Sequence, residues 1–165
     1  MHRTIIALLL LLTALTAAAD DAAQCRAGAG TFLTGVVVDA PKFTHGRFRK
    51  GIELSHTHLS VLSDRDGKIH DVAVDNLFAT GYDASTPGIP PALRAIRPHD
   101  RVEVCGAPYV RGNGIHWVHP TCGVRPEPQH PNGFLKRIEP DGRPSPNLEA
   151  NTNFCPIFHT GFFTP

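Results

Sequence analysis

The spacing of proline and glycine along this chain leaves room only for short elements of secondary structure. The sequence contains 15 Gly and 15 Pro, and these turn-forming residues are spread along the chain from residue 28 onward. Between them lie five short runs rich in β-branched and apolar residues, which are typical of strands. The runs cover residues 31–39, 56–62, 69–74, 101–106 and 115–119. A mainly all-β fold is therefore expected.

The order of these runs indicates which all-β fold is expected. Asp66-Gly67 between the second and third runs predicts a tight hairpin, because both residues tolerate a positive φ angle. Prolines at 87, 90 and 91 exclude a strand before residue 101, whereas Pro91 to Ile96 predicts one or two helical turns. Three strands, a short helical connection and two further strands are the order of a small five-stranded OB-like barrel. A β-sandwich needs more strands than these.

The first nineteen residues have the pattern of a cleavable signal peptide. A basic start, Met1 to Arg3, precedes an apolar run from Ile5 to Leu15 and three small residues, Ala17 to Ala19. The apolar run is too short to span a bilayer, which takes about 20 apolar residues. We therefore predict cleavage before Asp20 and a periplasmic or secreted protein. The mature chain is expected to be a soluble monomer that is not inserted in a membrane.

The remaining residues divide into a barrel domain and a tail. We predict an OB-like domain over 20–140 and an irregular, proline-rich C-terminal tail over 141–165, with an apolar end around Phe154 to Phe163. Loss of residues 1–19 removes Arg3 from the 16 basic residues and none of the 15 acidic residues, so the mature chain has no formal net charge. Any binding of an anionic partner must therefore depend on a local patch.

Four cysteines remain after cleavage, and an even number in an exported chain predicts two disulfides. Three pairings are possible. Cys105 with Cys122 is the local candidate, because the two bracket an apparent hairpin, and Cys25 with Cys155 would then tie the ends together. A four-thiolate metal site is the alternative, but the chain has no C-x-x-C pair, which such sites usually contain. The tail is thus expected to be held by a disulfide.

Several short motifs resemble a family of short exported bacterial proteins of unknown function. They are His45-Gly46-Arg47-Phe48, Asp100-Arg101-Val102 with Gly106, Ile115-His116-Trp117-Val118-His119, and His130 with Gly133-Phe134. The resemblance spans roughly residues 30–140, and the His-Trp-x-His element is its most specific part. It implies an OB-like fold and brings no activity with it.

A basic and aromatic segment over 42–50 is the first candidate binding site. It contains four cations and no acid, and two phenylalanines lie between the cations. Such a segment could follow an anionic backbone while its rings stack on bases or sugars, or it could be a solvated loop that caps the barrel. The candidate ligand-binding residues are Phe43, His45, Arg47, Phe48, Arg49, Lys50 and Trp117.

Histidines form the second candidate site. His56 and His58 alternate on a strand and so project from one face. His116 and His119 are three residues apart and would point to opposite faces unless the strand ends between them. Three imidazoles and a water would form a catalytic zinc geometry, so His56, His58, His116 and His119 are candidate ligands of zinc or another divalent metal. The alternative is that they are ordinary polar surface residues.

Two functions follow from these sites. The first is an exported, non-enzymatic binding module for an anionic polymer or a protein partner, with the 42–50 segment and the exposed face of the second and third strands as its contact surface. The second is a metal-binding protein or a metal-dependent hydrolase. The chain has no G-x-S-x-G element and no glycine-rich phosphate loop, which disfavours two large classes of enzyme.

Overall fold

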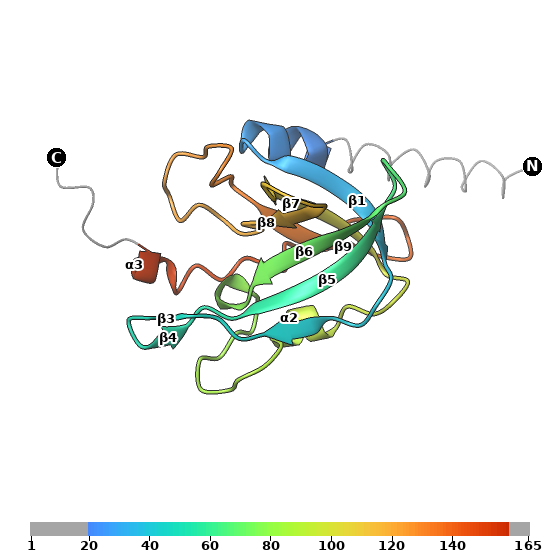
Figure 1. The fold of residues 1–165 in the computed structure, drawn as a ribbon. Coiled ribbons are helices and arrows are strands. Elements are labelled where there is room, and N and C mark those ends of the chain that lie inside the picture. The colour runs from blue at the N-terminus through green and yellow to red at the C-terminus, as the bar shows by residue number, and fades with distance from the viewer. Residues whose placement is uncertain (1–19, 159–165) are drawn as a thin grey trace, which may run out of the picture.

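The computed structural model describes residues 20–158 (Figure 1). The predicted signal peptide, residues 1–19, lies outside the described residues. The end of the apolar tail, residues 159–165, lies outside them as well.

Five strands close into a barrel around one core (Figure 1). They are β1 (Thr31–Val37), β5 (His56–Ser63), β6 (Ile69–Asp75), β7 (Arg101–Pro108) and β8 (Gly114–His116). Strand β1 pairs with both β5 and β7, β5 pairs with β6, and β8 bridges β6 and β7. The β6–β8 pairing is parallel and the other four are antiparallel. The predicted all-β, OB-like barrel is confirmed.

Strict alternation of side chains fills the barrel. Along β5 every second residue, such as Leu59 and Val61, is fully buried, and its neighbours face outward. Val72, Val74, Val102 and other aliphatic residues join them in the main core cluster. Burial of one such side chain contributes about 1.5–3 kcal/mol relative to exposure, so the alternation fixes the register of the strands.

Gly35 permits the closure of the barrel. A Cβ atom at Gly35 would lie 2.3 Å from the carbonyl oxygen of Leu62 on β5, closer than any side chain can come. At this residue β1 pairs with β5 along one edge and with Val102 of β7 along the other. A glycine is therefore required where the chain passes between its two neighbours.

The second half of the barrel differs from the prediction. The fifth run was expected to be a strand as far as His119, but β8 ends at His116 because Trp117 has a φ of 56°. An additional strand, β9 (Phe134–Ile138), pairs with β7 from Cys105↔Phe134 to Arg101↔Ile138. The sequence indicated only irregular structure there, since Lys136 and Arg137 interrupt the apolar run.

Short elements complete the fold. The 42–50 segment, expected to be a loop, contains β2 (Lys42–Thr44), which pairs with β5, and β3 (Phe48–Arg49), which pairs with β4 (Ile52–Glu53). Residues 20–27 are helical, and the remaining helices are η1 (Asn76–Phe78), α2 (Pro91–Arg94) and α3 (Cys155–Phe158). The helical turn predicted after Pro91 is confirmed. No helix within residues 20–158 is long and apolar enough to cross a membrane.

Two disulfides are present, but the pairing suggested by proximity in the sequence is wrong. Cys25 bonds Cys105, and Cys122 bonds Cys155, with Cα–Cα distances of 5.6 and 5.5 Å. Alternation along β7 directs Cys105 toward the N-terminal helix, where it is buried with Cys25 and Phe134. The first disulfide therefore fastens the N-terminal helix to β7, and the second fastens α3 to the segment after β8.

Candidate functional site

The outward side chains of β5, β6 and β8 form a continuous polar surface. His56 and His58 project from β5, and their ring centroids lie 6.5 Å apart, as their alternation predicted. Asp71 on β6 pairs with Gly114 of the parallel strand β8, and His116 follows two residues later. We call this surface the histidine face and define it as His56, His58, Asp71, Tyr109 and His116.

Asp71 joins two residues of the histidine face. The Nδ1 atom of His58 lies 2.9 and 3.0 Å from its two carboxylate oxygens, and the hydroxyl of Tyr109 donates to Oδ2 at 2.7 Å. Burial raises the pKa of Tyr109, and the hydrogen bond to Asp71 raises it further. Tyr109 can reach across β8 because Gly114 has no side chain: a Cβ atom there would lie 2.3 Å from the Tyr109 ring.

The other imidazoles of this face are close enough to influence one another. Burial lowers the pKa of His56, and the charges of His58 and His116 lower it further. Burial also lowers the pKa of His116, with a smaller contribution from His130. Both rings are therefore neutral at pH 7, when each can donate one hydrogen bond and accept another.

The sequence predicted that Trp117 and His119 lie in a strand, but both follow the end of β8. The Trp117 ring lies between those of His119 and His130, at centroid distances of 4.7 and 4.3 Å, and is partly buried. His119 is 4% exposed and stacks on Phe78 at 3.9 Å. Burial lowers the pKa of His119 to about 4. His119 is a core residue, because the chain turns inward where β8 ends.

The predicted metal site is not formed by the described residues. No group of three or more His, Cys, Asp or Glu side chains among residues 20–158 is arranged to hold a metal ion. His58 is directed toward Asp71 and His119 toward the core, so the set His56, His58, His116 and His119 does not converge on one point. The sequence predicted that His116 and His119 could join one site only if the strand ended between them; β8 does end at His116, but the turn that follows directs His119 into the core.

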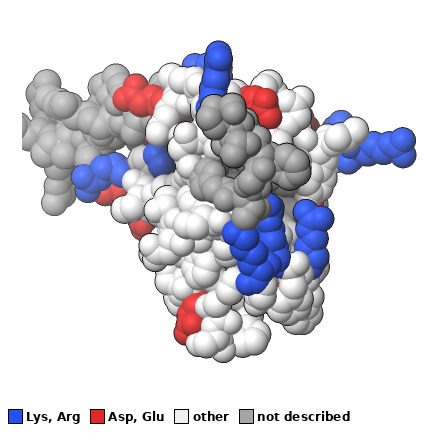
Figure 2. All heavy atoms as spheres, turned by 90° about the vertical axis from the view of Figure 1, so that its left-hand side faces the viewer, with Lys and Arg blue, Asp and Glu red and all other residues white. Residues whose placement is uncertain are grey.

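The basic segment lies beside the histidine face and extends to one end of the molecule. Lys42 pairs with His58 across β2 and β5. Further along, the guanidinium of Arg49 lies 5.4 Å from the centroid of the Phe158 ring, and Lys50 donates to the Pro156 carbonyl at 3.3 Å. Figure 2 looks onto this end and shows Lys and Arg side chains gathered there.

The side chains of Phe43 and His45 contact each other, whereas Phe48 is largely exposed. The Phe43 ring meets His45 edge to face, with centroids 4.9 Å apart, and the Nδ1 atom of His45 lies 2.8 Å from Glu53. Phe48 is 71% exposed. A large apolar ring this exposed gains nothing from the core, so it is available for contact with a ligand.

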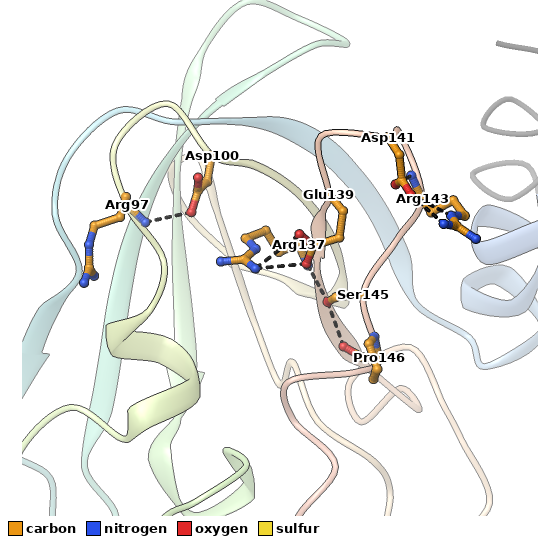
Figure 3. Close-up of polar contacts among 8 residues, drawn as sticks. All are labelled: Arg97, Asp100, Arg137, Glu139, Asp141, Arg143, Ser145 and Pro146. Carbon is orange, nitrogen blue, oxygen red and sulfur yellow. Dashed lines mark hydrogen bonds and ion pairs between the residues drawn. The ribbon is translucent and has the colours of Figure 1, made fainter. Parts of the chain in front are cut away.

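The opposite end of the barrel also contains arginines, but acidic neighbours neutralise them. Figure 3 shows Arg137 bonded to Glu139 and Arg143 bonded to Asp141, at 2.9 and 2.8 Å. The Asp100 carboxylate accepts from the backbone N–H of Arg97 in the preceding turn. In the basic segment Lys42 lies 3.9 Å from Asp39, but none of the acidic residues described lies within ion-pair distance of Arg47.

The sequence did not indicate that Tyr109 belongs to the site, or that Asp71 contacts both His58 and Tyr109. Tyr109 lies in the turn between β7 and β8, and only the short Asn113-Gly114 sequence next to it indicated that an aromatic ring could fold back there. The comparisons with known proteins add no further assignment. No protein-family model matches the chain, and no curated protein is significantly similar to it.

Proposed function

We propose that this protein is an exported binding module that holds an anionic polymer across the histidine face and the basic segment. The observation that carries the proposal is the continuity of the two surfaces. Lys42 lies beside His58, and the segment from Arg47 to Lys50 continues toward the end of the barrel. OB-fold barrels commonly bind oligonucleotides or oligosaccharides on the face of the second and third strands and on the adjoining loops.

The chemistry of the two surfaces supports this ligand class. Cations of the basic segment would neutralise charges of the polymer backbone, and this interaction weakens steeply as salt rises. Imidazole groups of the histidine face would donate hydrogen bonds to hydroxyl or phosphate oxygens. Phe48, largely exposed, would stack on a sugar or base. No catalytic step is required of any of these residues.

Export through a cleaved signal peptide is part of the proposal. The basic start, the apolar run and the three alanines before Asp20 support it. Two disulfides, which persist mainly in oxidising compartments, are compatible with the same destination.

Neutralising three cations of the basic segment is expected to weaken the binding of anionic polymers strongly without unfolding the protein. In the variant Arg47→Gln/Arg49→Gln/Lys50→Gln, the slope of log Kd against log salt for single-stranded DNA should fall by about 2, since each lost phosphate contact removes about 0.7. Fluorescence titration with labelled DNA and with heparin measures this. The melting temperature should change little, because Arg47 forms no ion pair within residues 20–158, and the contacts of Arg49 with Phe158 and of Lys50 with the Pro156 carbonyl contribute about 0.5–1.5 kcal/mol each.

The matched control neutralises arginines at the other end of the barrel. Arg137→Gln/Arg143→Gln removes two cations that already have acidic partners and should leave the affinity unchanged. Equal losses in the two variants, or no salt-sensitive binding by the native protein, would contradict the proposal.

A further inference from the structure

A second, chemically different site lies beside the β3–β4 hairpin. A pocket of about 160 Å³ opens between this hairpin and the loop that follows η1. In Figure 1 that loop passes below β3 and β4. The hairpin and its flanking residues contribute Phe43, Phe48 and Glu53 to the lining, and the loop contributes Tyr82 and Asp83.

Three aromatic rings form walls of this pocket. They are Phe43, Phe48 and Tyr82, which come from β2, β3 and the loop. Tyr82 is fixed by an edge-to-face contact with Phe154, with centroids 5.1 Å apart, and Phe43 is fixed in the same way by His45. The faces of aromatic rings carry negative partial charge and attract cations within about 6 Å.

Two carboxylates lie in the same lining. Glu53 accepts hydrogen bonds from His45 and from the backbone N–H of Gly46, which lower its pKa. Asp83 accepts from the hydroxyl and the backbone of Ser85 and from Thr86, which lower its pKa likewise. Both groups are thus ionised at neutral pH. Neither forms an ion pair with a Lys or Arg among residues 20–158.

The pKa of the Tyr82 hydroxyl reflects the negative charges around the pocket. Burial raises the pKa of Tyr82, and the negative charges of Asp75, Glu53 and Asp83 raise it further. Three carboxyl groups therefore act on one aromatic hydroxyl, and none of the contributions to this shift comes from a cation. A site with aromatic walls and two carboxylates that no Lys or Arg of residues 20–158 pairs with favours a ligand that is both apolar and positive.

We propose that this pocket binds an organic cation with an alkylated ammonium head, such as a trimethylammonium group. The methyl groups would contact the rings of Phe43, Phe48 and Tyr82, and the positive charge would lie near Glu53 and Asp83. Aromatic cages recognise quaternary ammonium ions in this way. The site differs from the proposed anion-binding surface in the charge that it selects, although the ring of Phe48 borders both.

The charge requirement is tested with two probes of the same shape. Choline and 3,3-dimethylbutan-1-ol differ only in that a neutral carbon replaces the quaternary nitrogen. In a titration of the mature protein followed by NMR, choline is expected to bind saturably and at least about tenfold more tightly than the alcohol, in keeping with about 1–2 kcal/mol for a cation held by aromatic rings. Equal affinities, or no saturable binding of choline, would overturn the proposal.

Variants locate the probe within the pocket. Glu53→Gln/Asp83→Asn retains the accepting oxygens but removes both charges, and Phe48→Ala removes a wall that is largely exposed, so that the fold is preserved. Each is expected to weaken choline binding at least about fivefold. Asp141→Asn is the matched control, because Asp141 accepts from the backbone two residues later just as Asp83 does. Losses no greater than in this control would also overturn the proposal.

Discussion

Replacing Cys25 and Cys105 together by alanine is expected to lower the free energy of unfolding by about 4.5 kcal/mol. The disulfide between them closes a sequence separation of 80 residues, and cross-links stabilise mainly by restricting the unfolded chain, more so when the loop is long. The disulfide also fastens the helix at residues 20–27 to β7. An ion pair between Asp21 and Lys136 joins the same helix to β9. Urea unfolding of the oxidised proteins measures the difference.

The second disulfide provides the internal comparison. Cys122 and Cys155 are separated by 33 residues, so the variant Cys122→Ala/Cys155→Ala should lose less, about 3.8 kcal/mol. Peptide mapping of the native protein without reduction should recover Cys25 linked to Cys105. A fragment in which Cys105 is linked to Cys122 would contradict the structure.

Replacing Glu149 by glutamine is expected to stabilise the fold at neutral pH. Glu149 is fully buried, and neither carboxyl oxygen has a hydrogen-bond partner in the described residues. Burial raises its pKa well above the ordinary 4.5, with a smaller contribution from Asp75. The folded chain therefore keeps a proton that the unfolded chain releases above pH 4.5, so the free energy of unfolding falls as pH rises from that value.

Glutamine removes this dependence because it has no proton to lose. Thermal unfolding should show the variant more stable than the native protein at pH 8, because the native chain loses about 1.4 kcal/mol of stability for each pH unit between 4.5 and the raised pKa of folded Glu149. The gain should shrink toward zero as the pH falls to 4.5. Glu139→Gln, which alters a surface ion pair, should change stability by less than about 1 kcal/mol. Stability curves that stay parallel at every pH would rule this account out.

Local patterns were sufficient to predict most of the barrel. Asp66-Gly67 predicted the hairpin between β5 and β6, where Gly67 has a φ of 64°. The apolar run at 56–62 predicted β5, which covers His56–Ser63. The sequence could not predict β9, because its last three residues, 136–138, are half-buried and show no apolar alternation. Their place in the sheet depends on pairing with β7. Long-range pairing likewise decides which cysteines meet, so proximity along the chain was misleading.

The candidate site, like the barrel, could be predicted from the sequence only in part. His56 and His58 could be placed on one face from their spacing alone. Asp71 could not be joined to Tyr109, because that contact depends on the register of β6 and β8 and on the absence of a side chain at Gly114. The aromatic pocket brings together residues about forty positions apart, Phe43 and Tyr82. No periodicity within either segment indicates this contact.

Mapping an anionic ligand on the isotope-labelled mature protein tests the central claim most directly. Chemical-shift changes on titration with a heparin oligosaccharide, and separately with single-stranded DNA, should be concentrated at residues 42–50 and at His56, His58 and His116. They should disappear at high salt. Shifts confined to the end of the barrel around Arg137 and Arg143, or no shifts with either polymer, would contradict the claim that this face binds anionic polymers.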